Sequence, residues 1–192
     1  ESLRMRPQHG LALLARGSVY AQRGEHGLAL ADLDAAIAVD SSDAIAYLQR
    51  GLVKIALGQL DRALPDLDKA CEWRPDDPRV WLNRGVCRLN LGKLGDSLAD
   101  FAKVLELSPG DTEALGNRAC ALVDLGRPSE ALADCDRVLS IAPGHDLALF
   151  NRGVALAHLG RKVEAKRSIE ASVTSDPESR RRAEAAIQRF GL

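Results

Sequence analysis

A gapless repeat of 34 residues runs through this 192-residue chain and constrains its fold more than any other feature. Five successive segments align: 10–43, 44–77, 78–111, 112–145 and 146–179. A repeat of this length is one supersecondary unit that cannot bury its own apolar face. The units must therefore stack on one another, and the expected architecture is a solenoid.

Small and apolar residues occupy fixed positions when each repeat is numbered from 1 to 34. Position 8 is Gly or Ala, position 15 is always Gly, and position 20 is Ala or Ser. Apolar residues at positions 4, 8, 11, 20, 24, 27 and 28 follow helical spacing, which predicts two amphipathic helices per repeat. Glycine at position 15 suits a left-handed turn that closes the first helix. We expect the small residues at positions 8 and 20 to let the paired helices approach closely.

Proline occupies position 32 in four repeats, as Pro75, Pro109, Pro143 and Pro177. Proline has no backbone N–H and restricts the residue before it. We therefore expect each of these prolines to end the second helix of its repeat.

One repeat carries the clearest family resemblance. Its residues are Trp81, Leu82, Asn83, Arg84 and Gly85, followed by Gly92, Ser97, Phe101, Val104 and Pro109. This pattern resembles the tetratricopeptide repeat, and the resemblance covers essentially the whole chain. It implies an all-α fold, a right-handed superhelical solenoid of antiparallel helix pairs. The chain departs from the family in having Arg at position 7 and Lys54 or Arg88 at position 11, whose stems can pack while their charged heads reach water.

The two ends of the chain fall outside the five repeats. Residues 1–9 fit the tail of a preceding repeat, with Pro7 on position 32, which suggests a fragment of a longer array. Residues 180–192 have apolar residues at helical spacing from Ala183 to Phe190 and charged residues elsewhere. This pattern predicts a C-terminal capping helix with a solvated outer face.

Composition excludes several classes of protein. Lys and Arg number 26 against 27 Asp and Glu, so no basic footprint indicates nucleic acid or an acidic membrane as a partner. The longest apolar stretches, such as 11–15, are far shorter than the roughly 20 residues that span a bilayer, and the start lacks a signal-peptide core. We expect a soluble, cytoplasmic protein.

No sequence motif indicates catalysis. The chain lacks a Walker loop, a nucleophile elbow, a His-Glu-x-x-His motif and a dinucleotide fingerprint, so neither enzymatic activity nor a cofactor is expected. The four cysteines show no zinc-ligand spacing, which favours a buried, reduced set. The four histidines are interpreted as surface residues.

A recurring Asp-x-Asp pair is the one pattern that could suggest a metal site. It occurs at positions 23 and 25 as Asp32 and Asp34, Asp66 and Asp68, and Asp134 and Asp136. On a helix, residues i and i+2 lie about 200° apart and cannot converge on one ion. We therefore expect no metal site.

Arginine at position 7 is matched by aspartate at position 23. The arginines are Arg16, Arg50, Arg84, Arg118 and Arg152, and the acids are Asp32, Asp66, Asp100 and Asp134, with Ser168 in the last repeat. Because these positions lie at the same height in an antiparallel helix pair, we expect Arg–Asp contacts within or between repeats that fail at Ser168. The alternative is an arginine row that grips phosphates, although the acids would cancel its field.

Amide side chains occupy position 6, as Gln49, Asn83, Asn117 and Asn151. This position lies off the stripe that packs within a repeat. In tetratricopeptide arrays, position 6 of the first helix faces the concave surface, so the resemblance places the amides along a groove. The row resembles the asparagine ladder of O-linked N-acetylglucosamine transferase arrays, since a carboxamide can both donate to and accept from a peptide backbone. The alternative is that each amide bonds to a neighbouring repeat or to water.

The remaining candidate groove residues are mostly apolar: Leu48, Leu52, Ile55, Arg79, Leu82, Val86, Leu89, Asn90, Val123, Phe150 and Val154. Such a strip favours a hydrophobic peptide. The dicarboxylate clamp of the family, which grips chaperone C-termini, is poorly matched because its key positions hold leucine or valine.

These features predict a non-enzymatic scaffold for protein–protein interactions that holds an extended or helical peptide in a concave groove. Two alternatives are open. The array is the substrate-selecting arm of a larger enzyme, or it is a self-association module that uses an open terminal repeat.

Overall fold

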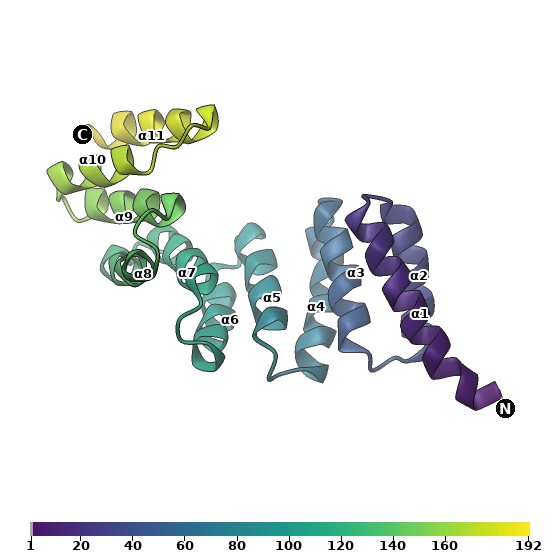
Figure 1. Cartoon of the computed structure of the whole chain (residues 1–192). Coiled ribbons are helices and arrows are strands. Elements are labelled where there is room, and N and C mark those ends of the chain that lie inside the picture. Colours follow the sequence, from purple (N-terminus) through teal and green to yellow (C-terminus); the bar gives the residue numbers. More distant parts are fainter. Residues whose placement is uncertain (1) are drawn as a thin grey trace. The chain divides into compact units, whose positions relative to one another are not determined.

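The computed structural model describes residues 2–192, with side chains from residue 9 onward. In this part of the chain it has eleven α-helices and no strand (Figure 1). The chain divides into two compact units, one ending at Lys93 and one beginning at Leu94. The first unit holds α1 (Ser2–Gln22), α2 (His26–Val39), α3 (Ala44–Ala56), α4 (Leu60–Trp73) and α5 (Pro78–Asn90). The second holds α6 (Leu94–Leu107), α7 (Thr112–Asp124), α8 (Pro128–Ile141), α9 (Asp146–His158), α10 (Lys162–Ala171) and α11 (Pro177–Phe190).

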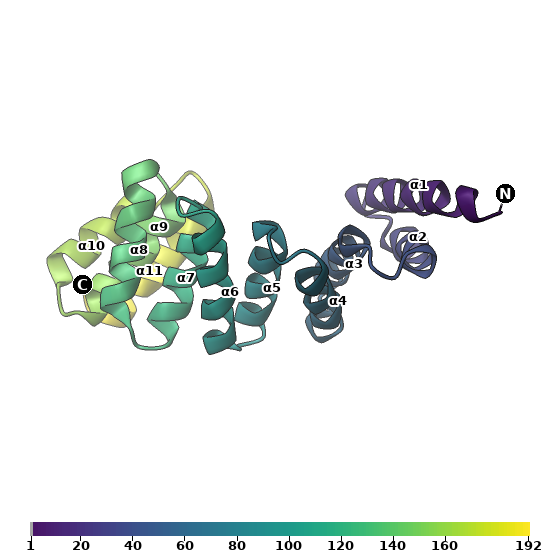
Figure 2. The same cartoon turned by 90° about the horizontal axis from the view of Figure 1, so that it is seen from below.

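Successive helices within each unit pack side by side as antiparallel pairs (Figure 1 and Figure 2). The turn inside each pair is set by the glycine at position 15. All five of these glycines have positive φ, between 70° and 76°. In the turn after α3, Gln59 N–H donates to the carbonyl of Lys54 at 2.8 Å, the bond that closes a Schellman motif. The predicted left-handed turns are confirmed.

The core is built where the small residue at position 8 meets the large one at position 24. Leu33, Leu67 and Ile169, at position 24, are fully buried. Gly153 lies so close to α10 that a Cβ atom there would stand 2.5 Å from Cγ1 of Ile169. Close approach of the paired helices, expected from the small residues, is therefore seen directly.

Prolines at position 32 follow the second helices α4, α6 and α8, as predicted. The fifth repeat differs, because α10 already ends at Ala171 and Pro177 is the first residue of α11. Proline is tolerated there because the first N–H groups of a helix have no intrahelical acceptor. The prediction that Pro177 ends a helix is wrong, and the capping helix begins at 177 rather than 180.

Four of the first helices, α3, α5, α7 and α9, begin directly after a capping residue in position 34. Asp43, Asp77 and Asp111 each accept a hydrogen bond from a backbone N–H of the first turn. His145 takes this place before α9, where its Nδ1 accepts from Ala148 N–H at 3.2 Å. This histidine, interpreted from sequence as a surface residue, is therefore a helix cap.

The N-terminal helix is longer than expected. A single helix, α1, extends from Ser2 to Gln22 and passes through Pro7, so the predicted helix end at that proline is wrong. The side chains of residues 1–8 lie outside the described residues. The assignment of 1–9 to a preceding repeat stays a prediction.

Candidate interaction surface

Arginine–aspartate pairs join the two helices of a repeat. Arg16 and Asp32 form two hydrogen bonds of 2.7 and 2.8 Å, and Arg118 and Asp134 form two of 2.7 Å. The bonds from Arg16 hold the pKa of Asp32 below its usual range. The predicted contacts are confirmed for these pairs, which bring together positions 7 and 23.

The same row also joins successive repeats. Arg50 bonds to Asp66 of its own repeat and, through Nη1, to Asp34 of the preceding repeat at 2.6 Å. In the last repeat, Arg152 turns to Asp136 of the repeat before it, at 2.7 Å. Ser168, which replaces the acid, donates to the carbonyl of Leu149 instead. The prediction that the last repeat lacks its own Arg–Asp contact, because Ser168 replaces the acid, is confirmed.

These contacts explain the recurring Asp-x-Asp pair. The two carboxylates point to the arginines of consecutive repeats rather than toward each other, as Asp134 with Arg118 and Asp136 with Arg152 show. Among the described residues, no group of three His, Cys, Asp or Glu side chains is placed to hold a metal ion. The arginines are engaged by carboxylates, so the row is a structural element.

The amide row at position 6 is not uniform. Asn83 Nδ2 donates to the carbonyl of Arg79, one turn earlier in α5, at 2.8 Å. Asn151 is 7% exposed, and its Nδ2 is buried without a hydrogen-bond partner among the described residues. Gln49 and Asn117 are half-buried. Asn151 is therefore the member of the row whose donor is both buried and without a partner among the described residues.

Several predicted groove residues of the first unit have other roles. Leu48 is 5% exposed and belongs to the core with Leu67 and Val80, so its assignment to the groove is wrong. Leu52 and Ile55 are half-buried and pack against the same core. The guanidinium of Arg79 is held by the capping carboxylate of Asp77, with Nη2 and Oδ2 2.7 Å apart.

The helix α5 carries the remaining predicted residues of the first unit. Leu82, Val86 and Leu89 are half-buried, and Asn90 is exposed at the last residue of the helix. These four residues follow one another along a single helix. Their assignment to a binding groove stays a prediction.

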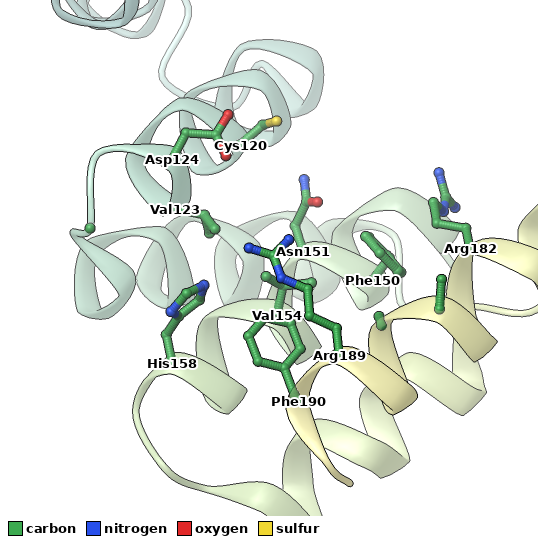
Figure 3. A pocket seen from close by; sticks show the side chains of 13 residues that line it. Cys120, Val123, Asp124, Phe150, Asn151, Val154, His158, Arg182, Arg189 and Phe190 are labelled. Carbon is green, nitrogen blue, oxygen red and sulfur yellow. The ribbon is translucent and has the colours of Figure 1, made fainter.

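The second unit brings four predicted residues together around a real pocket. Val123 of α7 and Phe150, Asn151 and Val154 of α9 line a cavity of about 580 Å³ (Figure 3). The opposite wall comes from α11, which the sequence predicted only as a cap. The additional polar or aromatic lining residues are Asp124, His158, Arg182, Arg189 and Phe190.

Cation–π and ring contacts arrange the α11 side of this pocket. The guanidinium of Arg182 lies 4.6 Å from the centroid of the Phe150 ring, and that of Arg189 lies 5.3 Å from Phe190. The ring of His158 meets Phe190 edge-on, with centroids 5.1 Å apart. Arg182 and Arg189 are seven residues apart, a spacing that puts both on one face of a helix. That spacing is the signal in the sequence that could have indicated the second wall.

The cysteines offer little nucleophilic chemistry. Cys71, Cys87 and Cys135 are buried thiols, and Cys120 is half-buried beside the pocket. Burial and the nearby Asp124 raise the pKa of the Cys120 thiol, which keeps it protonated. The pocket lining therefore offers hydrogen-bond donors and apolar surface, which is chemistry suited to binding.

Paired helices that repeat every 34 residues, with an open pocket on the first helices, define an α-solenoid of the kind that binds other proteins. The family model for the tetratricopeptide repeat matches residues 1–45, 48–112 and 117–180. The chain belongs to the tetratricopeptide repeat family, and its repeats make it a scaffold for protein–protein interactions.

Solved structures share this fold. YrrB, a TPR protein with an unusual peptide-binding site, aligns with a TM-score of 0.80 and 24% identity over 94% of this chain and 91% of that one. The MamA protein aligns with a TM-score of 0.80 and 14% identity over 96% and 97%. A tetratricopeptide repeat protein from Parabacteroides merdae gives 0.85 and 19% over 96% and 74%. A comparison with curated protein sequences gives no match.

None of the helices described in residues 2–192 combines the length and the apolar character required to cross a membrane.

Proposed function

We propose that this chain is a non-enzymatic scaffold that holds a partner peptide against its first helices, with the pocket among α7, α9 and α11 as a principal contact. One observation carries the proposal: Asn151, whose buried Nδ2 has no acceptor among the described residues, lines a cavity with both apolar and polar walls. A buried donor without a partner costs about 1 to 3 kcal/mol, and a peptide carbonyl would satisfy it.

The size and lining of the cavity support a peptide as the ligand. Its volume of about 580 Å³ is in the range of small-ligand sites. Phe150, Val123 and Val154 are half-buried and supply apolar contact area, while Asn151 supplies backbone recognition that is independent of the side chains of the partner. The shared fold of YrrB, a protein with a peptide-binding site, agrees with this proposal.

The test is affinity capture from the source cells with three purified baits. Val154→Lys places a charge on the pocket wall, and Val163→Lys places the same charge on α10, where Val163 is 75% exposed. We expect the wild type and Val163→Lys to retain the same partners and Val154→Lys to lose them. Thermal melts must first show that all three baits are folded. Partners that stay on the Val154→Lys bait would place the binding surface elsewhere.

A further inference from the structure

The pocket has more hydrogen-bond donors than acceptors. Nδ2 of Asn151 and Nε of Arg182 are both buried and unpaired among the described residues. In the described part of the chain, neither Arg182 nor Arg189 forms an ion pair with a carboxylate. Asp124 is the single carboxylate in the lining, set against two guanidinium groups. Such a lining is complementary to a ligand that brings its own acceptors and negative charge.

The arginines at position 7 of the repeats are engaged differently. Arg16, Arg50, Arg118 and Arg152 each bond to an aspartate at 2.6 to 2.8 Å. The two pocket arginines instead rest on aromatic rings, which leave the hydrogen-bonding edge of a guanidinium free. They are held in place without their charge being neutralised.

The spacing of the two arginines matches a pair of carboxylates. Seven residues of α-helix correspond to roughly 10 Å between the Cα atoms of Arg182 and Arg189, so two acidic groups about that far apart can each reach one guanidinium group. A chain terminus offers a single α-carboxylate, so at least one acceptor must be an acidic side chain. An extended segment rises about 3.3 Å per residue, so roughly 10 Å corresponds to about three residues.

We propose that the pocket among α7, α9 and α11 selects partner segments that carry two acidic side chains two to four residues apart with an apolar residue between them. Arg182 and Arg189 bind the two carboxylates, Asn151 donates to a backbone carbonyl, and the apolar residue lies against Phe150 and Val154. In Figure 3 these groups come from α9 and α11 and border one cavity. This inference rests on the proposed function and adds the chemistry of the partner.

The test uses random 12-residue peptides displayed on phage with their C-termini fused to the coat protein, so that no free chain end is presented. The full 192-residue chain is the target. Selected sequences are then synthesised with acetylated and amidated ends, and their affinities are measured by fluorescence anisotropy. We expect enrichment of Asp or Glu pairs at the proposed spacing and binding that weakens as salt is added.

Two double variants locate the site. Arg182→Gln with Arg189→Gln should weaken the acidic peptides at least tenfold, since charge-assisted hydrogen bonds are lost. Arg180→Gln with Arg181→Gln removes the same charge from exposed positions of the same helix and should change affinity less than twofold. A third variant, Asn151→Asp, keeps both arginines and adds a carboxylate to the pocket. It should weaken the acidic peptides more than their Glu→Gln analogues, because both lose the donor of Asn151 and only the acidic peptides also meet a like charge.

The outcomes separate this inference from the proposed function. Binding peptides that lack acidic pairs, or acidic peptides that bind the Arg182 and Arg189 variant unchanged, would overturn the inference and leave peptide binding intact. If Asn151→Asp binds acidic peptides as tightly as the wild type, the inference is also wrong. A failure to select any binding peptide would refute the proposed function, and this inference with it.

Discussion

Asp66 accepts hydrogen bonds from two cations, whereas Asp32 and Asp134 of the same row each accept from one arginine. Arg50 bonds to both of its oxygens, and Lys54 Nζ lies 2.7 Å from Oδ2. The Asp66 side chain is 5% exposed, whereas that of Asp34, the second acid bonded to Arg50, is 62% exposed. Burial makes the loss of a charge partner expensive, because the remaining cations cannot be solvated.

Replacing each acid with asparagine therefore has unequal effects. We expect Asp66→Asn to lower the free energy of unfolding by about 3 kcal/mol, because two cations lose their buried partner. Asp34→Asn should cost less than about 1 kcal/mol, as expected for an exposed ion pair. Urea unfolding followed by circular dichroism measures both. Equal losses in the two variants would show that burial does not control the strength of these pairs.

Cys135 makes the stability of the folded chain depend on pH in the alkaline range. Burial, together with Asp134 and Asp136, raises the pKa of this thiol from 9.0 to about 12. Below pH 9 the thiol is protonated in both states, so it contributes no pH dependence. Between pH 9 and about 12 the unfolded chain releases the proton and the folded chain keeps it, so stability falls as pH rises.

The measurement compares wild type with Cys135→Val at pH 8 and pH 11. We expect the wild type to lose more stability over this interval than the variant, because valine cannot titrate. The native thiol should also react with iodoacetamide at pH 9 far more slowly than the same residue in urea. Parallel pH profiles for the two proteins would contradict the raised pKa.

At the scale of helices, one of the ion pairs that join successive repeats is missing, because position 102 of α6 is alanine. Position 25 is Asp in the first, second and fourth repeats and Ala in the third. Arg118 uses Nε and Nη2 for Asp134, whereas Arg50 has its Nη1 on Asp34 as well. A hollow of about 360 Å³ lies beside Ala102 and Arg118. Ala102 therefore supplies no carboxylate to Nη1 of Arg118 at this position.

Restoring this acid should stabilise the second unit. Ala102→Asp and Ala102→Asn carry a similar loss of helix propensity, so their difference isolates the charge. We expect the Asp variant to be more stable than the Asn variant by about 0.5 to 1 kcal/mol. In an Arg118→Gln background the difference should vanish. Thermal melts of the four proteins provide the measurement, and a persistent difference without Arg118 would rule out this pairing.

The helices and their turns could be predicted from the sequence because the residues that form them recur at the same position of each repeat. The glycine turns, the Arg–Asp pairs and the packing of position 8 against position 24 depend on residues at constant spacing, such as Gly58, Arg50 and Leu67. Features outside the repeat were missed. The wall formed by α11 has no counterpart in the repeats. The bonds of Arg79 to Asp77 and of Asn83 to its own helix are local side-chain hydrogen bonds that the repeat pattern does not determine.

At the scale of the whole molecule, stability in a repeat protein is a sum of local and nearest-neighbour terms. A defect in one repeat should therefore remain close to its origin. Gly153 and Gly116 provide a matched pair of sites, because both are helical glycines in the second unit. A Cβ at Gly153 would meet Ile169 at 2.5 Å and the carbonyl of Ala165 at 2.9 Å, whereas a Cβ at Gly116 has nothing within 4 Å.

We expect Gly153→Ala to force α9 and α10 apart at a cost of about 1 to 3 kcal/mol. Gly116→Ala should be neutral or stabilising by up to about 1 kcal/mol, because alanine has the higher helix propensity. Hydrogen exchange should show that the first variant loses protection in α9, α10 and α11 while α3 and α4 exchange as in the wild type. Because α9 and α11 form the pocket walls, peptide binding should weaken with this loss. A uniform loss of protection in all helices would instead mean that the chain unfolds as one cooperative unit.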